Sequence, residues 1–99
     1  MRKRRSFSRE FKREAVSMVL DQGFSAGDVS HQLDIGETAL RRWVKQVSFE
    51  RDGGVPQGPA LTEEQREIQL LKSKIKQLEQ EKMILKKATA LLVSDEINR

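Results

Sequence analysis

The chain has 99 residues, with 19 Lys or Arg against 15 Asp or Glu and no Cys. This length allows one small domain and an extension rather than a large catalytic domain, and the lack of Cys excludes disulfide frameworks and thiolate zinc sites. No apolar run approaches the roughly 20 residues of a membrane-spanning helix, and no apolar stretch follows the basic start as in a secretory signal. We therefore expect a cytoplasmic protein with no membrane partner.

The excess positive charge lies in the first half of the chain. Residues 1–47 contain ten Lys or Arg and six Asp or Glu, a net charge of +4, whereas residues 48–99 contain nine of each and are neutral. Such a basic segment favours a polyanionic partner. The same charge is also compatible with a basic tail that only keeps the protein soluble.

Three helical segments are predicted before residue 48, and no alternating apolar pattern indicates a strand, so we expect an all-α fold. The first helix spans about Ser8–Gln22, where apolar residues recur on one face, and Gly23 ends it in the left-handed conformation. The second begins at Ser25, whose hydroxyl can cap a free N–H, and stops near Asp34. The third runs from about Glu37 to Val47.

The second and third segments have the spacing of a helix-turn-helix, which we place in a domain of residues 8–47. Ser30 supplies the small residue needed where the two helices cross. Asp34 stands where Gly usually opens the turn, and Asp tolerates a positive φ. Apolar side chains fill the wedge between the helices: Val29, Leu33, Ile35, Leu40 and Trp43.

With Leu40 and Trp43 pointing inward, the opposite face of the third helix is fixed by geometry. Arg on that face can form bidentate bonds to guanine and Thr can meet a thymine methyl, which favours reading of double-stranded DNA in the major groove. The alternative is an ordinary solvated face on a three-helix bundle. The predicted DNA-binding residues are Glu37, Thr38, Arg41, Arg42 and Lys45 on this face, with Arg2, Lys3, Arg4 and Arg5 in a basic arm of residues 1–7.

Residues 48–61 contain both prolines and three of the six glycines, without helical periodicity. Proline removes a backbone donor and glycine is costly to order, so this composition predicts a flexible linker.

A long helix is predicted for residues 62–93, followed by a tail of residues 94–99. Thr62 can cap it, and Leu recurs every seven residues from Leu71 to Leu92. The second core position holds Leu61, Ile68 and Ile75 and continues through Lys82 and Thr89. Such a seam must pair with another helix, and its residue types favour a parallel dimer. The predicted dimerisation residues are Ile68, Leu71, Ile75, Leu78, Lys82, Leu85 and Leu92.

The charges beside this seam favour one orientation. In a parallel, in-register homodimer every flanking pair is opposite in sign, whereas an antiparallel pairing brings like charges together. The alternative is a long helix that packs back on the first domain. The parallel pairs are Glu67 with Lys72, Lys74 with Glu79, and Glu81 with Lys86.

The sequence resembles the first-frame protein (OrfA) of a large family of bacterial insertion sequences. The resemblance rests on three segments, 7–12 (FSREFK), 40–46 (LRRWVKQ) and 85–92 (LKKATALL). It implies binding to the terminal inverted repeats of the element, multimerisation through the zipper, and a partner. That partner is the full transposase, made when the ribosome changes frame and joins this region to a catalytic domain; the codons of Lys86 and Lys87 are a candidate slippage site.

No strand is predicted, so we expect no catalytic domain, no enzyme activity, no cofactor and no metal site. His31 is a lone imidazole, expected to be solvated. The leading hypothesis is a transposition protein that binds DNA, dimerises and works near the bacterial nucleoid. Two alternatives share its sequence features in whole or in part: a helix-turn-helix transcriptional repressor and a coiled-coil adaptor whose basic half is incidental.

Overall fold

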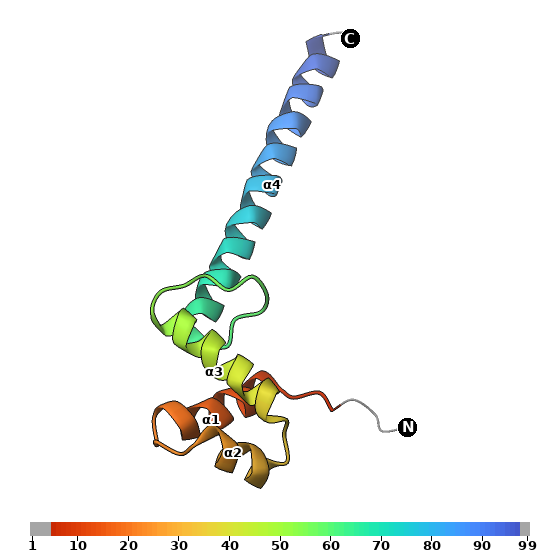
Figure 1. The fold of residues 1–99 in the computed structure, drawn as a ribbon. Helices are drawn as coiled ribbons and strands as arrows, with labels where there is room; N and C mark the ends of the chain where they lie inside the picture. The colour runs from red at the N-terminus through yellow and green to blue at the C-terminus, as the bar shows by residue number, and fades with distance from the viewer. Residues whose placement is uncertain (1–4, 98–99) are drawn as a thin grey trace. The chain divides into compact units, whose positions relative to one another are not determined.

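The computed structural model describes residues 5–97, and no strand occurs in that range, which confirms the predicted all-α class. The chain divides into two compact units between Arg66 and Glu67. The first turn of the last helix therefore belongs with the first three helices. The four helices are α1 (Arg9–Leu20), α2 (Ala26–Leu33), α3 (Glu37–Arg51) and α4 (Glu63–Ile97), coloured in chain order in Figure 1.

Helix α2 lies between the predicted cap Ser25 and Asp34, whereas α1 has Ser8 as its cap rather than as its first residue and ends at Leu20, before the predicted end at Gln22. The Ser8 hydroxyl accepts the backbone N–H of Phe11, and the Ser25 hydroxyl accepts that of Asp28, each over 3.1 Å. Gly23 has a φ of +81°, a conformation that a residue without a Cβ adopts at little cost. Each cap satisfies a donor that the helix itself leaves free.

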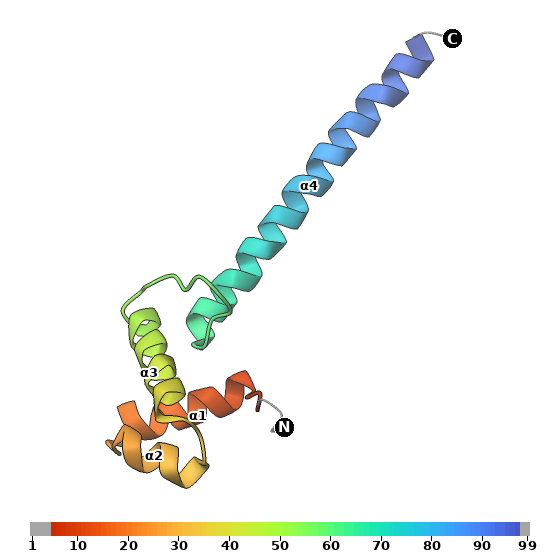
Figure 2. The same cartoon turned by 45° about the vertical axis from the view of Figure 1, so that its right-hand side comes forward.

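The turn between α2 and α3 has the geometry that the sequence predicts. Asp34 is left-handed, with φ 54° and ψ 51°, and the N–H of Ile35 donates to the carbonyl of Ser30 over 3.0 Å. Ser30 is buried and its hydroxyl donates to the carbonyl of Gly27, so a small polar residue fits against α3 without an unpaired hydroxyl. Figure 2 shows α2 leading through this turn into α3, with α1 beside both.

Helix α3 ends at Arg51, four residues beyond the predicted end at Val47. Two contacts with residues distant in sequence stabilise the additional turn. The Arg51 guanidinium donates to both carboxylate oxygens of Asp21, over 2.8 and 3.0 Å. Glu50 is buried, and its carboxylate accepts the backbone N–H groups of Leu61 and Thr62. Tertiary contacts therefore extend a helix whose local pattern had ended.

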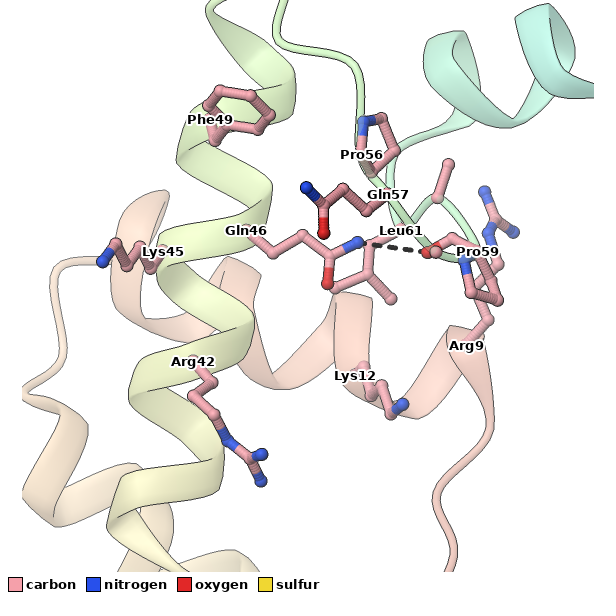
Figure 3. Close-up of a pocket in the computed structure, with 12 residues that line it drawn as sticks. Arg9, Lys12, Arg42, Lys45, Gln46, Phe49, Pro56, Gln57, Pro59 and Leu61 are labelled. Carbon is pink, nitrogen blue, oxygen red and sulfur yellow. Dashed lines mark hydrogen bonds between the residues drawn. The ribbon is translucent and has the colours of Figure 1, made fainter.

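The chain after α3 returns to the domain before α4 begins. The Gln46 side-chain amide donates to the carbonyl of Pro59 over 3.1 Å, as the dashed line in Figure 3 marks. Ala60, Leu61 and Thr62 are all buried. Residues 59–62 are thus held against α3 by hydrogen bonds and by burial of apolar surface.

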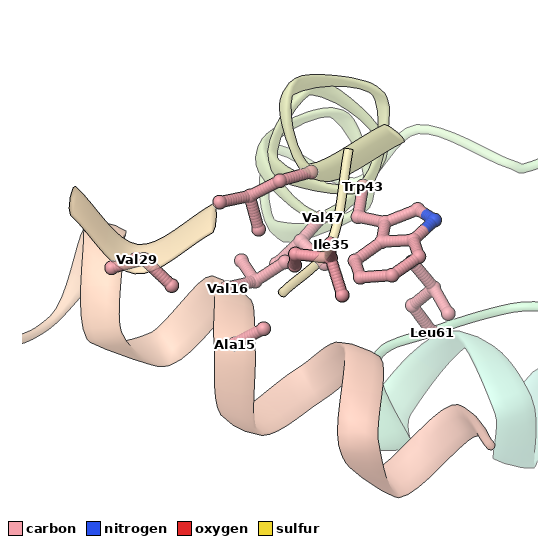
Figure 4. Packing of buried hydrophobic residues seen from close by; sticks show 8 residues of the cluster. Ala15, Val16, Val29, Ile35, Trp43, Val47 and Leu61 are labelled. Carbon is pink, nitrogen blue, oxygen red and sulfur yellow. The ribbon is translucent and has the colours of Figure 1, made fainter. Parts of the chain in front are cut away.

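Leu61 lies in the core of the first unit, not in the coiled-coil seam where its spacing had placed it (Figure 4). The prediction was wrong because α4 begins only at Glu63, so Leu61 precedes the helix on which the seam lies. Val16 of α1 is 1% exposed and lies in the same core. The buried core cluster consists of Ala15, Val16, Val29, Ile35, Leu40, Trp43, Val47 and Leu61.

Helix α4 begins as predicted after Thr62, whose hydroxyl oxygen accepts the N–H of Gln65 over 3.4 Å. It continues to Ile97, beyond the predicted end at Val93. Within residues 5–97, no helix combines the length and the apolar character that crossing a lipid bilayer requires.

Candidate nucleic-acid interface

The outward face of α3 carries all five residues predicted on that helix. The side of α3 that packs on α1 and α2 presents Leu40, Trp43 and Val47, all buried, so the helical period sets the opposite side to face away from the core. The five exposed residues on the outer face are Glu37, Thr38, Arg41, Arg42 and Lys45.

Two of these residues are bonded to each other. The Arg41 guanidinium donates to one carboxylate oxygen of Glu37 through Nε over 3.2 Å and through Nη2 over 2.7 Å. The pair is spaced i, i+4, the arrangement in which side chains on a helix meet. Glu37 thus orients the guanidinium of Arg41 near the start of α3, where a recognition helix meets base edges.

Arg5, the one described residue among the four basic residues of the predicted arm, lies at the turn that precedes α3. Its guanidinium donates to the carbonyl of Asp34 and lies 3.6 Å from the Asp34 carboxylate. It also sits over the ring of Phe7, 4.8 Å from the ring centre, and Phe7 meets Trp43 edge to face. Arg2, Lys3 and Arg4, also predicted to bind DNA, lie outside the described residues.

Lys12 on α1 lines the same groove as Arg42 and Lys45 of α3, although no role was predicted for it. Its ammonium lies 5.6 Å from the centre of the Trp43 ring. A cation over an aromatic face is attracted by the negative potential of the ring. The sequence signal was weak, because a lysine near the start of an amphipathic helix is ordinary until the crossing of α1 and α3 is known.

Arg9 and Arg13 serve a different purpose. Both donate to the same carboxylate oxygen of Glu63, over 2.8 and 2.7 Å. The hydrogen bond from Arg9 lowers the pKa of Glu63, and the charges of Arg9 and Arg13 lower it further. These two arginines therefore hold the first residue of α4 against α1.

The predicted dimerisation residues form an exposed row on α4. The exposed fractions of the apolar members run from 38% at Ile68 to 69% at Leu92, so large apolar side chains face water in the second unit. Leu78, Lys82 and Leu85 line a shallow groove along this row. The full set is Ile68, Leu71, Ile75, Leu78, Lys82, Leu85 and Leu92, and all seven are exposed.

Among residues 5–97, no three or more His, Cys, Asp or Glu side chains gather in a way that fits a metal ion. His31 is exposed on α2.

Comparison with known proteins agrees with the geometry of α2 and α3. The family model described as Transposase, a helix-turn-helix class, matches residues 1–76. InsN of insertion sequence element IS911A from Escherichia coli (strain K12) is 45% identical over 87 residues, covering 88% of this chain and 65% of that protein. The chain thus spans slightly less than two thirds of that relative.

Two further relatives match nearly their whole length. InsN of IS911B from the same strain is 42% identical over 85 residues, covering 86% of this chain and 97% of that protein. An 11 kDa protein of insertion element IS600 from Shigella sonnei is 31% identical over 96 residues, covering 97% and 94%. No solved structure has significant similarity to the chain. The chain belongs to the helix-turn-helix transposase family, among the OrfA-type proteins of insertion sequences.

Proposed function

We propose that the protein binds the terminal inverted repeats of an insertion element, with α3 lying in the major groove. The observation that carries this proposal is the exposed outer face of α3, opposite the buried Leu40, Trp43 and Val47. The helix-turn-helix transposase family supports DNA as the ligand. Terminal repeats as the target follow from the resemblance to OrfA-type proteins.

In this proposal the first two turns of α3 read bases. Thr38 contacts a thymine methyl, and Arg41 donates to the two acceptors of a guanine edge while Glu37 holds its guanidinium in place. Arg42 lies four residues after Thr38 and Lys45 four residues after Arg41, and these two bring positive charge to the phosphates. Arg5 and the arm residues Arg2, Lys3 and Arg4 add contacts to the backbone or the minor groove.

We further propose that α4 pairs in parallel with α4 of a second copy. Its support is the row of exposed Ile and Leu side chains, because a single helix leaves that surface in water at a cost of about 25 cal/mol per Å². Lys82 lies within the row, and a dimer tolerates it because its ammonium reaches water from the edge of the seam. A dimer presents two DNA-reading heads, as two repeats require.

The proposed partner of the dimer is the full transposase, which carries the catalytic domain and shares this amino-terminal region. In this proposal the protein catalyses no reaction itself. It binds element ends in the cytoplasm, at the nucleoid, and pairs with the transposase through α4. Frameshifting at the codons of Lys86 and Lys87 is the proposed source of that longer partner.

Footprinting on a fragment that carries both element ends and the element's promoter tests the DNA target. We expect protection of the paired ends; protection confined to a promoter operator would instead identify a transcriptional repressor. Arg41→Ala is expected to lose about 1–3 kcal/mol of discrimination at one base pair while α3 stays folded. An unchanged site preference in Arg41→Ala would remove this residue from the reading face.

The orientation of the dimer can be tested because the chain has no cysteine. In a parallel, in-register pair each seam residue lies beside its own copy, so Leu71→Cys should oxidise to a covalent dimer. The control is Lys76→Cys, which lies on the outer side of α4 away from the seam. Failure of Leu71→Cys to cross-link in a protein that sediments as a dimer would exclude the parallel arrangement.

A further inference from the structure

A groove of about 730 Å³ lies between α1, α3 and residues 56–61 (Figure 3). Its charged side chains come from two helices: Arg9 and Lys12 from α1, and Arg42 and Lys45 from α3. No Asp or Glu is among the described residues that line it. The charge of the groove is therefore entirely positive, which favours an anionic occupant.

Three of the four cations are available to such an occupant. Arg9 is bonded to Glu63 and holds the start of α4. Lys12, Arg42 and Lys45 have no carboxylate within ion-pair distance anywhere in residues 5–97. By contrast Arg41, on the neighbouring part of α3, is paired with Glu37.

The position of Lys12 is fixed relative to α3 rather than to α1 alone. Its ammonium lies over the ring of Trp43, which is a buried core residue of α3. Lys12 is itself half-buried, so its side chain has less conformational freedom to lose on binding than an exposed lysine. The opposite wall is also fixed, because Gln46 donates to the carbonyl of Pro59.

We infer that this groove holds the sugar–phosphate backbone of DNA, with Lys12, Arg42 and Lys45 as the phosphate contacts. The inference rests on the proposed function, because it requires that the outer face of α3 enter the major groove. Arg42 and Lys45 belong both to that face and to the groove, so the strand that borders the major groove passes between them and α1. Contacts to phosphate fix the register of a protein on DNA but do not read sequence.

The test compares Lys12→Gln and Lys45→Gln with the wild-type full chain on two duplexes, an element end and a scrambled sequence of equal length. Each lost phosphate contact should lower the slope of log affinity against log salt by about 0.9. We expect each variant to weaken binding to both duplexes by the same factor. Lys76→Gln removes the same charge from α4 and should keep the wild-type slope. Helicity and Trp43 fluorescence verify that each variant is folded.

The two proposals fail in different ways. If the wild type prefers the element end but both variants keep the wild-type salt slope, the phosphate groove is excluded and the proposed function stands. If the wild type binds both duplexes equally while the variants lower the slope, the groove binds DNA backbone and the proposed recognition of element ends is overturned. A loss of discrimination in Lys12→Gln, rather than a uniform loss of affinity, would also contradict a contact to phosphate.

Discussion

The carboxylate of Glu50 accepts the backbone N–H of Leu61 through both of its oxygens, each over 3.1 Å. It also accepts the N–H of Thr62 over 3.0 Å, the Thr62 hydroxyl over 2.9 Å and the Gln46 amide over 2.7 Å. A negative charge beside the first N–H groups of a helix is favourable, because these groups have no partner within the helix. Glu50 thus attaches the start of α4 to the last turn of α3.

Replacing Glu50 by Gln should destabilise the first unit by about 1–3 kcal/mol, because a buried amide cannot accept all the donors that the carboxylate satisfies. The chain has one Trp, and Trp43 is buried in this unit, so its fluorescence reports unfolding of the first unit separately from the helicity of α4. Glu14→Gln is the matched control, since Glu14 is an exposed residue of α1. Equal melting of the two variants would contradict the role given to Glu50.

Acid should weaken the same attachment. Burial by itself would raise the pKa of Glu50, but the hydrogen bonds from Thr62, Leu61 and Gln46 outweigh it and lower the pKa below its ordinary value. The contribution of the carboxylate is therefore fully present above the pKa of the unfolded chain, about 4.3, and is lost as pH falls through the lower pKa of the folded state.

The expected result is a gap in stability between wild type and Glu50→Gln that narrows as pH falls below about 4. Trp43 fluorescence during urea unfolding at a series of pH values measures it. Asp21 and Glu63 also have lowered pKa values, from hydrogen bonds to Arg51 and Arg9, so both proteins lose stability in acid. The difference between wild type and Glu50→Gln removes this shared loss and leaves the effect of Glu50. If the difference in unfolding free energy stays constant down to pH 3, the carboxylate of Glu50 does not make the proposed contribution.

Leu61→Ala distinguishes a core residue from a seam residue. Leu61 is 5% exposed in the core of the first unit. Its truncation should therefore lower the free energy of unfolding of this unit, as Trp43 fluorescence reports it, by about 2–5 kcal/mol. The dimer should persist in sedimentation at a temperature where the first unit is folded. Leu78→Lys should do the reverse, giving monomers with a normal Trp43 transition. If Leu61→Ala is monomeric and its Trp43 unfolding transition is unchanged, Leu61 belongs to the dimer seam and not to the core of the first unit.

These residues show which parts of the fold the sequence could predict. The cap at Ser25 and the left-handed Asp34 follow from local chemistry, and the structure has them where predicted. Leu61 could not be assigned, because it lies seven residues before Ile68 and fits the heptad as well as any core leucine. Glu50 was missed because a carboxylate after the last apolar residue of a helix is ordinarily solvated.

Some residues of the candidate interface could likewise be predicted from the sequence, and others could not. The outer face of α3 follows from the helical period once Leu40 and Trp43 are taken as buried, so its five residues could be named in advance. The place of Lys12 depends on where α1 crosses α3 and on the return of residues 56–61 beside them. Those are tertiary relationships between segments distant in sequence, and no local pattern encodes them.

Exchanging charges beside the α4 seam tests the proposed parallel dimer without disturbing its apolar residues. In the parallel pairing Lys74 lies beside Glu79 of the second copy, so Lys74→Glu turns two attractive contacts into repulsive ones. Exposed pairs are worth about 0.2–1 kcal/mol, so the dimer Kd should rise several-fold at low salt and less at high salt.

Adding Glu79→Lys to Lys74→Glu should restore the wild-type Kd, because the pair is then reversed but again opposite in sign. In an antiparallel pairing centred on the same heptads, position 74 meets its own copy. Lys74→Glu would then exchange one like-charged pair for another and leave the Kd unchanged. Lys76→Glu, on the outer side of α4, makes the same change in net charge. Sedimentation equilibrium of the four proteins therefore separates the parallel arrangement from the antiparallel one and from a general effect of charge.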